Sequence, residues 1–320
     1  MRRTLPALLI LTAILVYFSI FRILSDFFEI IAIDAVSIFA LVLSSDSFVD
    51  QARAVSSRFR ISNASMGKFI LATGAVLDEI AVVLDSSLRG FGGISFGTIE
   101  GSNILTLVIL IILIPVAVTG ALRKHTGGAL LILLASCLIV PLAFLPQSYT
   151  LIFAPFLILV FLFYVFTGNS HSQNEEDEHR DFSILTMIFS VVVLSLSSNA
   201  LVIYTDSLSA ISGISSFASG FIITGIAGSL PEITMFITSI RKIDGQAAMG
   251  VVIGSTIYKG AFLLAISMLL TRIYFRPGLQ AMLLMILASV MLIFLTGVRM
   301  RRLYSLMLAA IIAIATYLIY

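Results

Sequence analysis

The sequence predicts an all-α membrane protein of about eleven transmembrane helices, with two inverted five-helix repeats and one extra N-terminal helix. Three observations lead to this prediction. Of the 320 residues, 59% are hydrophobic and only 11% are charged, and the mean hydropathy of +1.13 is far above that of soluble proteins. The basic residues between the apolar runs gather on alternate loops. Finally, one long segment occurs twice along the chain.

Eleven apolar stretches reach or approach the roughly 20 residues that a spanning helix needs. They lack the alternation of polar and apolar residues found in membrane barrels, which favours helices. The first stretch follows Arg2 and Arg3 without a cleavage site of small residues, so we expect a retained helix rather than a signal peptide. The predicted spans are 5–24, 29–55, 63–88, 95–118, 126–145, 149–168, 182–206, 216–240, 246–271, 278–298 and 303–320.

The loops between these spans differ in charge from one side of the membrane to the other. Thirteen basic residues fall on one side and four on the other, which places the N-terminus in the cytoplasm and the C-terminus outside. The basic residues of the cytoplasmic side are Arg2, Arg3, Arg53, Arg58, Arg60, Arg123, Lys124, Arg180, Arg241, Lys242, Arg299, Arg301 and Arg302, against Arg22, Arg89, Arg272 and Arg276 outside.

Four segments follow from this layout. Residues 1–28 contain the extra N-terminal helix, 29–168 the first five-helix repeat, 169–181 an acidic cytoplasmic linker and 182–320 the second five-helix repeat. The linker is the most polar stretch of the chain and is typical of a flexible connector. A regulatory role of its acidic residues, such as loose sensing of Ca2+ or protons, is the alternative; these residues are Glu175, Glu176, Asp177 and Glu178.

The internal repeat appears when the sequence is shifted by 153 residues without a gap. Residues 64–110 then align with 217–263, and twelve of 47 positions are identical. Each copy has the pattern L-x-E-I, followed 18 residues after its glutamate by G-x-x-x-G-S-x-I. The first residues of the two copies are five spans apart, and an odd number of spans reverses the direction of the chain across the bilayer. The copies are therefore expected to be inverted, as in many secondary transporters. A duplicated helix hairpin with no transport role is the alternative.

The glutamates of the two copies, Glu79 and Glu232, are the predicted metal ligands. A carboxylate in the middle of a bilayer costs several kcal/mol unless it is paired or hydrated, and two at equivalent positions also repel each other. A hard cation such as Ca2+ between them removes both costs, because it prefers carboxylate, hydroxyl and main-chain carbonyl oxygens. A buried ion pair or a protonated acid is the alternative for each.

Further ligands are expected around the two glutamates. Pro231 cannot donate a backbone hydrogen bond, so we expect its helix to open around Ala227 and Gly228 and to offer freed carbonyls. The serine hydroxyls could also serve small-residue packing, and the threonines could bond to their own helices. The candidate ion-binding residues beyond Glu79 and Glu232 are Ser229, Ser102, Ser255, Thr106, Lys259, Gly228, Thr73, Thr224, Glu100 and Asp78.

The second copy resembles the cation/Ca2+ antiporter superfamily, which includes sodium/calcium and Ca2+/H+ exchangers. Residues 227–232 (AGSLPE) and 250–255 (GVVIGS) are similar to the G-T-S-L-P-E and G-N-x-x-G-S signatures of that superfamily. Ser45–Val49 and Ile61–Asn63 resemble the approach to its first repeat. The residues of the motif are closer to those of the sodium/calcium branch. The extra N-terminal span and the acidic linker are similar to those of Ca2+/H+ antiporters.

Two departures from this pattern bear on mechanism. The first copy has Ala75, Val76, Leu77 and Asp78 where the signature has Thr-Ser-Leu-Pro, and four residues after the G-S serines Thr106 and Lys259 replace the usual Asn or Asp. An ammonium can occupy the place of a bound monovalent cation. We therefore hypothesise fewer sodium sites than in a typical member, or a site that switches by protonation. Glu100 is a possible partner of this lysine; the alternative is that the lysine snorkels and Glu100 faces a loop.

The resemblance implies a secondary active antiporter that exchanges a divalent cation, with Ca2+ favoured, for Na+ by alternating access in the plasma membrane of a prokaryote. The alternatives are an H+-coupled divalent cation exchanger, a cation channel and a degenerate relative that does not transport. A membrane protease is disfavoured, because the sequence has neither a paired G-x-G-D nor an H-E-x-x-H motif. No enzymatic activity, cofactor or nucleic-acid partner is expected, only inorganic cations and the lipid bilayer. The sequence leaves the ions, their stoichiometry and the oligomeric state open.

Overall fold

The computed structural model describes residues 4–21, 27–58, 76–117, 125–167, 182–242 and 245–297. Every regular element within these ranges is helical. The α-helices are α1 (Thr4–Phe21), α2 (Phe27–Arg58), α4 (Leu77–Leu88), α5 (Gly92–Ala117), α6 (Thr126–Ile139), α7 (Gln147–Thr150), α8 (Ala154–Thr167), α9 (Ile184–Ser212), α10 (Ser216–Ser219), α11 (Ile226–Lys242), α12 (Gly245–Ile257), α13 (Leu264–Leu270) and α14 (Leu279–Gly297). Short 3-10 turns are η2 (Val140–Ala143), η3 (Leu151–Phe153) and η6 (Arg276–Gly278), and two π-helical segments are η4 (Gly220–Gly225) and η5 (Tyr258–Leu263).

Seven helical stretches of the described chain are long and apolar enough to cross a membrane. They confirm the all-helical membrane class, whereas the count of eleven spans and the inverted arrangement stay predictions. The predicted last span, 303–320, and the first part of the span 63–88 lie outside the described residues. The seven stretches are Phe27–Gln51, Gly92–Leu113, Thr126–Ala143, Gln147–Thr167, Ile184–Ser212, Met249–Leu270 and Arg276–Thr296.

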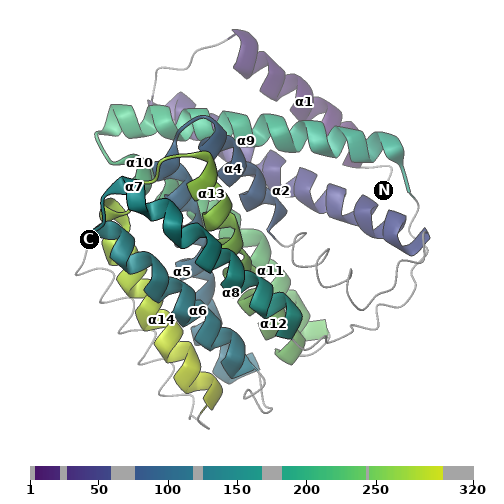
Figure 1. Ribbon diagram of the computed structural model, residues 1–320. Coiled ribbons are helices and arrows are strands. Elements are labelled where there is room, and N and C mark those ends of the chain that lie inside the picture. The colour runs from purple at the N-terminus through teal and green to yellow at the C-terminus, as the bar shows by residue number, and fades with distance from the viewer. Residues whose placement is uncertain are drawn as a thin grey trace.

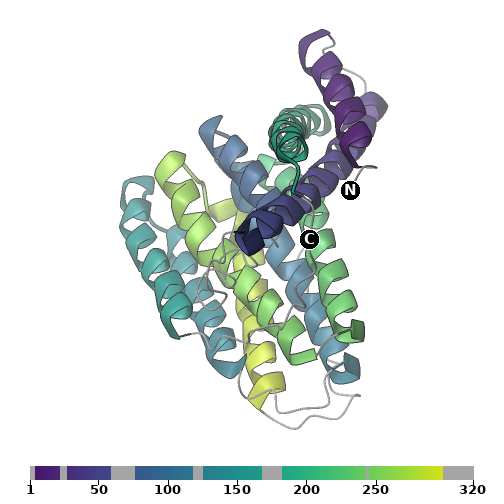
Figure 2. The same ribbon diagram turned by 90° about the vertical axis from the view of Figure 1, so that its right-hand side faces the viewer.

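The helices pack in two groups. Helices α1, α2 and α9 share one apolar cluster, and the long α9 runs across the direction of most other helices (Figure 1). Figure 2 looks along the axis of α9 and shows the helices of the other group as a bundle beside and below it. The apolar core of that bundle comes from α5, α6, α8, α12, η5, α13 and α14. The buried polar residues described below lie within this bundle and at its contact with α4 and α11.

The end of α9 differs from the sequence prediction. The predicted span ended at residue 206, but the helix continues to Ser212. Gly213 ends it with a φ of 71°, a left-handed conformation that glycine adopts without steric cost, and its N–H bonds the carbonyl of Ser209. The hydropathy falls at Asp206, but the helical hydrogen bonding does not.

Helix α5 and the π-helical segment η4 cross at very short distance. A Cβ added to Gly225 would lie 2.9 Å from the Cα of Gly101, so only glycines allow this approach. Next to the crossing, the hydroxyls of Thr98 and Thr224 are hydrogen bonded to each other. The crossing joins the G-x-x-x-G-S segment of the first copy to the segment that precedes the signature of the second. It brings Glu79, Ser102 and Glu232 into one neighbourhood.

Candidate ion-binding site

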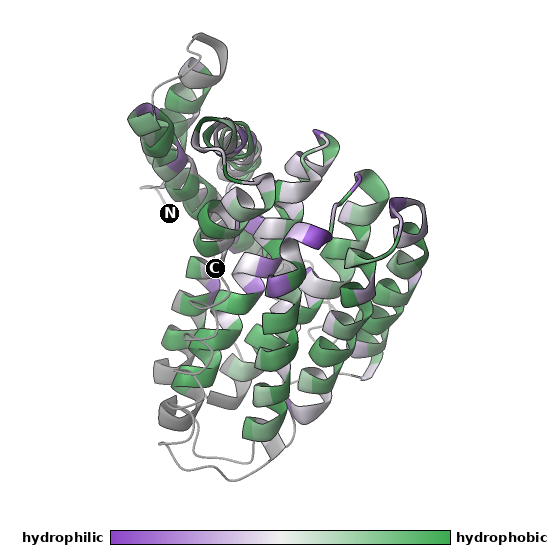
Figure 3. Ribbon diagram, turned by 90° about the vertical axis from the view of Figure 1, so that its left-hand side faces the viewer, coloured by the Kyte–Doolittle hydropathy of each residue, from purple (hydrophilic) through white to green (hydrophobic). Residues whose placement is uncertain are grey.

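The two glutamates of the repeated motif share one lysine. The Nζ atom of Lys259 lies 2.6 Å from Oε2 of Glu232 and 3.3 Å from Oε1 of Glu79. The side chain of Lys259 is fully buried, and those of both glutamates are 1% exposed. Figure 3 shows hydrophilic residues gathered at mid-height between apolar helices. The glutamates from α4 and α11 therefore converge, as the repeat predicts, and the charge that joins them belongs to the protein itself.

Hydroxyl groups of α5 complete this network. Ser102 Oγ donates to Glu79 Oε1 at 2.9 Å and accepts from Lys259 Nζ at 2.6 Å, while Thr106 Oγ1 donates to Glu232 Oε2 at 2.8 Å. The other carboxylate oxygens, Glu79 Oε2 and Glu232 Oε1, are buried and have no hydrogen-bond partner among the described residues. Each carboxylate thus keeps one oxygen free for a further ligand.

Asp78 adds a third carboxyl group. It precedes Glu79 on α4, is 1% exposed and interacts electrostatically with Glu79 and Glu232. One ammonium therefore faces two glutamates and a neighbouring aspartate within a water-poor region. When all three acids are ionised, the charge of Lys259 does not balance them, and the surplus favours a cation from solution.

Lys259 reaches the glutamates from a π-helical segment. The segment η5 interrupts the helix that α12 and α13 would otherwise form, and π-helical turns in α-helices are frequent at functional sites. The rings of Tyr258 and Phe262 pack on each other and on Phe161 of α8, with centroids 4.9–5.3 Å apart. These aromatic contacts hold the segment on both sides of Lys259 and fix the direction from which the lysine enters the site.

The predicted opening of the helix around Ala227 and Gly228 is wrong. Helix α11 runs without a break from Ile226 to Lys242 and includes Pro231. The irregular turn lies earlier, in η4, where the chain is π-helical from Gly220 to Gly225. Pro231 is therefore accommodated within a continuous helix, and the irregular backbone precedes that helix.

Gly228 serves a different purpose from the one expected. A Cβ at this position would lie 2.6 Å from Cγ of Glu79, so the glycine gives room to the glutamate of the other copy. The contact is between the backbone of α11 and a side chain of α4. The close packing of the two motifs explains why a small residue stands here.

Replacing Gly228 with Ala is expected to displace the Glu79 carboxylate and to destabilise the protein by about 1–3 kcal/mol through overpacking. Thermal unfolding in detergent and cation uptake measure the two effects. Gly127→Ala is the matched control, because a Cβ at Gly127 meets nothing within 4 Å. Equal unfolding temperatures for both variants would contradict the tight contact at Gly228.

The remaining predicted site residues do not all lie at the two glutamates. Ser229 donates to the carbonyl of Ile226 at 2.7 Å, and Thr224 to that of Gly220 at 2.7 Å, so both bond to their own helices. Ser255 donates to the carbonyl of Val252 and also lies beside the Glu232 carboxylate. Thr73 lies outside the described residues.

Glu100 does not pair with Lys259 in the structure. It is 1% exposed and faces a different small cavity, with no ion pair to a described residue, so neither the pairing nor a place facing a loop is found. The reason is that Glu79 and Glu232 take the ammonium of Lys259. Asn103, which was not among the predicted residues, is fully buried in the same helix as Glu100. A polar residue directly after the G-S motif of an apolar helix could have indicated a site residue.

The chain was compared with family models, with curated proteins and with solved structures, and all three comparisons found membrane proteins or exchangers. The family model described as sodium/calcium exchanger protein matches residues 29–167 and again 182–320. An uncharacterised membrane protein of Methanocaldococcus jannaschii is 26% identical over 228 residues, which are 68% of this chain and 74% of that protein. The Ca2+/H+ antiporter protein YfkE has a similar fold, with a TM-score of 0.72, 16% identity and coverage of 99% of this chain and 100% of that one. The sodium-calcium exchanger NCX_Mj follows with a TM-score of 0.56, 20% identity and coverage of 90% and 98%.

Proposed function

Because the chain belongs to the sodium/calcium exchanger protein family, we propose that it is a secondary active antiporter that exchanges a divalent cation, Ca2+ foremost, for Na+ by alternating access. The observation that carries this proposal is the ammonium of Lys259 held between Glu79 and Glu232. A site that holds one internal cation between two buried carboxylates has the charge and the size to hold an external one.

The substrate cation replaces the ammonium rather than joining it. The free oxygens Glu79 Oε2 and Glu232 Oε1, together with the hydroxyls of Ser102 and Thr106, offer hard oxygen ligands. Ca2+ takes about six to eight oxygens, and water completes the set. Electrostatic repulsion between the two cations moves the lysine away from at least one glutamate when the ion enters.

The number of sodium ions is smaller than in a site with two unpaired glutamates. With Lys259 protonated, the trio with Glu79 and Glu232 carries one net negative charge instead of two. Fewer monovalent ions are then needed to neutralise the site before the protein reorients it from one side of the membrane to the other. Exchange against H+ is the alternative, because a lysine that gives up its proton when the divalent ion binds would couple transport to a pH gradient.

The two matches of the family model support the division into repeats 29–168 and 182–320, joined by the linker 169–181 and preceded by an extra helix in 1–28. We propose that the repeats are inverted and that the N-terminus is cytoplasmic. The protein then resides in the plasma membrane of a prokaryotic cell. Cysteine residues introduced at positions 2 and 320 and labelled from outside intact cells would test both ends.

Cation uptake into proteoliposomes tests the proposed function. Ca2+, Mg2+ or Mn2+ is added outside three kinds of vesicles. The first contain Na+, the second have a lower internal pH, and the third have neither gradient. We expect saturable Ca2+ uptake driven by the outward Na+ gradient. In Glu232→Gln, uptake should fall on the order of 100-fold or more, because a broken buried charge pair costs about 3–5 kcal/mol.

Asp85→Asn is the control for this experiment, since the described residues pair Asp85 with Arg89 on a partly exposed face of α4. Flux that persists without any counter-ion and does not saturate would identify a channel. Full transport by Glu232→Gln would contradict the proposal, and uptake driven by protons alone would select the H+-coupled alternative.

A further inference from the structure

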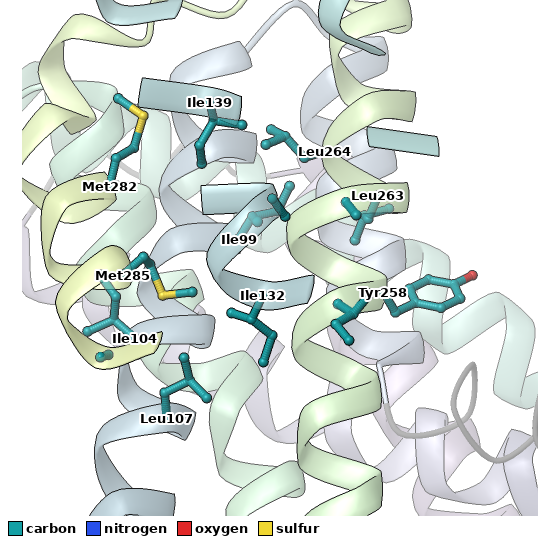
Figure 4. Close-up of a cluster of buried hydrophobic side chains, with 14 of the residues drawn as sticks. Ile99, Ile104, Leu107, Ile132, Ile139, Tyr258, Leu263, Leu264, Met282 and Met285 are labelled. Atoms are coloured by element: carbon teal, nitrogen blue, oxygen red, sulfur yellow. The ribbon is translucent and has the colours of Figure 1, made fainter. Parts of the chain in front are cut away.

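A second group of buried polar side chains lies on α5 close to the shared lysine. Glu100 and Asn103 face a cavity of about 10 Å3, which is room for one water-sized particle. Ser136 of α6 and Thr256 of α12 line the same cavity. The other walls are apolar, and Figure 4 shows three of the side chains that form them, Ile132, Ile139 and Met285, packed in the core.

The polar atoms of this cavity lack partners within the protein. Oε2 of Glu100 and both Oδ1 and Nδ2 of Asn103 are buried without a hydrogen-bond partner among the described residues. The hydroxyls of Ser136 and Thr256 donate to the carbonyls of Ile132 and Val252, at 2.9 and 2.8 Å. Their protons are therefore used within their own helices, while their oxygen lone pairs remain available to an ion.

The charge of Glu100 needs compensation from outside the protein. Within the described residues it forms no ion pair, and Lys259 is taken by Glu79, Glu232 and Ser102. An ionised carboxylate buried among apolar side chains without a partner costs several kcal/mol. A cation small enough for the cavity removes this cost.

We propose that Glu100, Asn103, Ser136 and Thr256 form a Na+ site separate from the site at Lys259. All four offer oxygen ligands, one negative charge matches a monovalent ion, and the cavity admits a particle of about the size of water. A divalent ion would keep an uncompensated positive charge there. Ca2+ also needs more oxygens than these four side chains supply.

The proposed Na+ site adjoins the first site without sharing its ligands. Asn103 follows Ser102 on α5, and Gly260 follows Lys259 in η5. A Cβ on Gly260 would lie 3.2 Å from Nδ2 of Asn103, so the amide contacts the π-helical segment that carries the lysine. An ion held by Asn103 therefore lies against the backbone that positions Lys259. The site goes beyond the proposed exchange and is tested without any transport.

Sodium binding to the purified full-length protein tests this site. Thermal unfolding in detergent is followed by circular dichroism while NaCl replaces choline chloride at constant ionic strength, and binding of 22Na+ is measured at equilibrium. We expect a saturable, Na+-dependent rise of the unfolding temperature in the wild type. Glu100→Gln should remove one bound 22Na+ per protein and the part of the rise that this ion causes, while Na+ still binds at Lys259, and Ser136→Ala should weaken Na+ binding at Glu100 by roughly tenfold. Asp85→Asn should match the wild type.

Glu232→Gln separates the two sites, because it disturbs Na+ binding at Lys259 and should keep the part of the Na+ effect that Glu100→Gln removes. A Na+ effect that is lost in Glu232→Gln but kept in Glu100→Gln would assign Na+ to the site at Lys259 and overturn this inference. The absence of any effect in the wild type would overturn it as well. If Glu100→Gln does not fold, unchanged Na+ affinity of Ser136→Ala decides against the site. Failure of cation exchange in vesicles would leave these binding results standing and would refute only the proposed function.

Discussion

Replacing Lys259 with Met is expected to lower the free energy of unfolding by about 3–5 kcal/mol in a buffer free of divalent cations, because two buried carboxylates lose their shared counter-charge. Met is unbranched and flexible and fills a similar space, so the loss is mainly electrostatic. The apparent unfolding temperature in detergent should fall on the order of 10 °C.

Adding a divalent cation should offset a large part of the destabilisation of Lys259→Met. A metal that binds only the folded state at 100 times its dissociation constant stabilises by about 2.7 kcal/mol. A titration of Ca2+ against the unfolding temperature measures this rescue. Arg89→Met is the control, because it breaks the exposed pair with Asp85, and exposed pairs contribute about 0–1 kcal/mol. A Lys259→Met protein as stable as the wild type without metal would show that the ammonium does not neutralise the glutamates.

Replacing Lys259 with Asp is expected to make cation exchange depend more steeply on Na+. The change removes a positive charge and adds a carboxylate, so two charges must be supplied by additional ions before the site is neutral. Initial rates of Ca2+ uptake as a function of internal Na+, together with the reversal potential, measure the number of Na+ ions per Ca2+. Lys259→Asn should have an intermediate value. The same Na+ dependence in all three proteins would contradict the replacement of a bound cation by the lysine.

The membrane class and the neighbourhood of the two motifs could be predicted from the sequence. Long apolar stretches have few alternatives to helices in a bilayer, because backbone groups must bond within the segment. The repeated glutamates followed at equal spacing by glycine and serine pointed to one buried site, and Ser102 and Thr106 do contact Glu79 and Glu232. Repetition at fixed spacing is a strong signal because apolar composition alone cannot produce it.

The π-helical segments and the partner of Lys259 could not be predicted in this way. The two copies align without a gap, yet η5 is π-helical while the corresponding part of α5 is regular. In η5, Tyr258 and Phe262 pack against Phe161, which lies almost a hundred residues earlier in the chain, and a local sequence pattern does not reveal such contacts. Likewise, whether Lys259 pairs with Glu100 or with Glu79 and Glu232 depends on the helix face that each glutamate occupies. Local residue spacing does not determine that face across different helices.

The positive charge between the two glutamates belongs to a side chain and, unlike a bound ion, cannot leave the site when the substrate dissociates. In an exchanger whose two carboxylates have no counter-charge, the ion-free protein has a high barrier to reorientation. The uncompensated charges would have to move within the apolar layer. Lys259 contacts Glu79 and Glu232 and cannot diffuse away as a bound ion can, so its ammonium lowers this barrier. We expect the proposed exchanger to return unloaded at a measurable rate, so that a fraction of its substrate moves without counter-transport. Ca2+ release into a medium without exchangeable cations is a direct measure of this slippage.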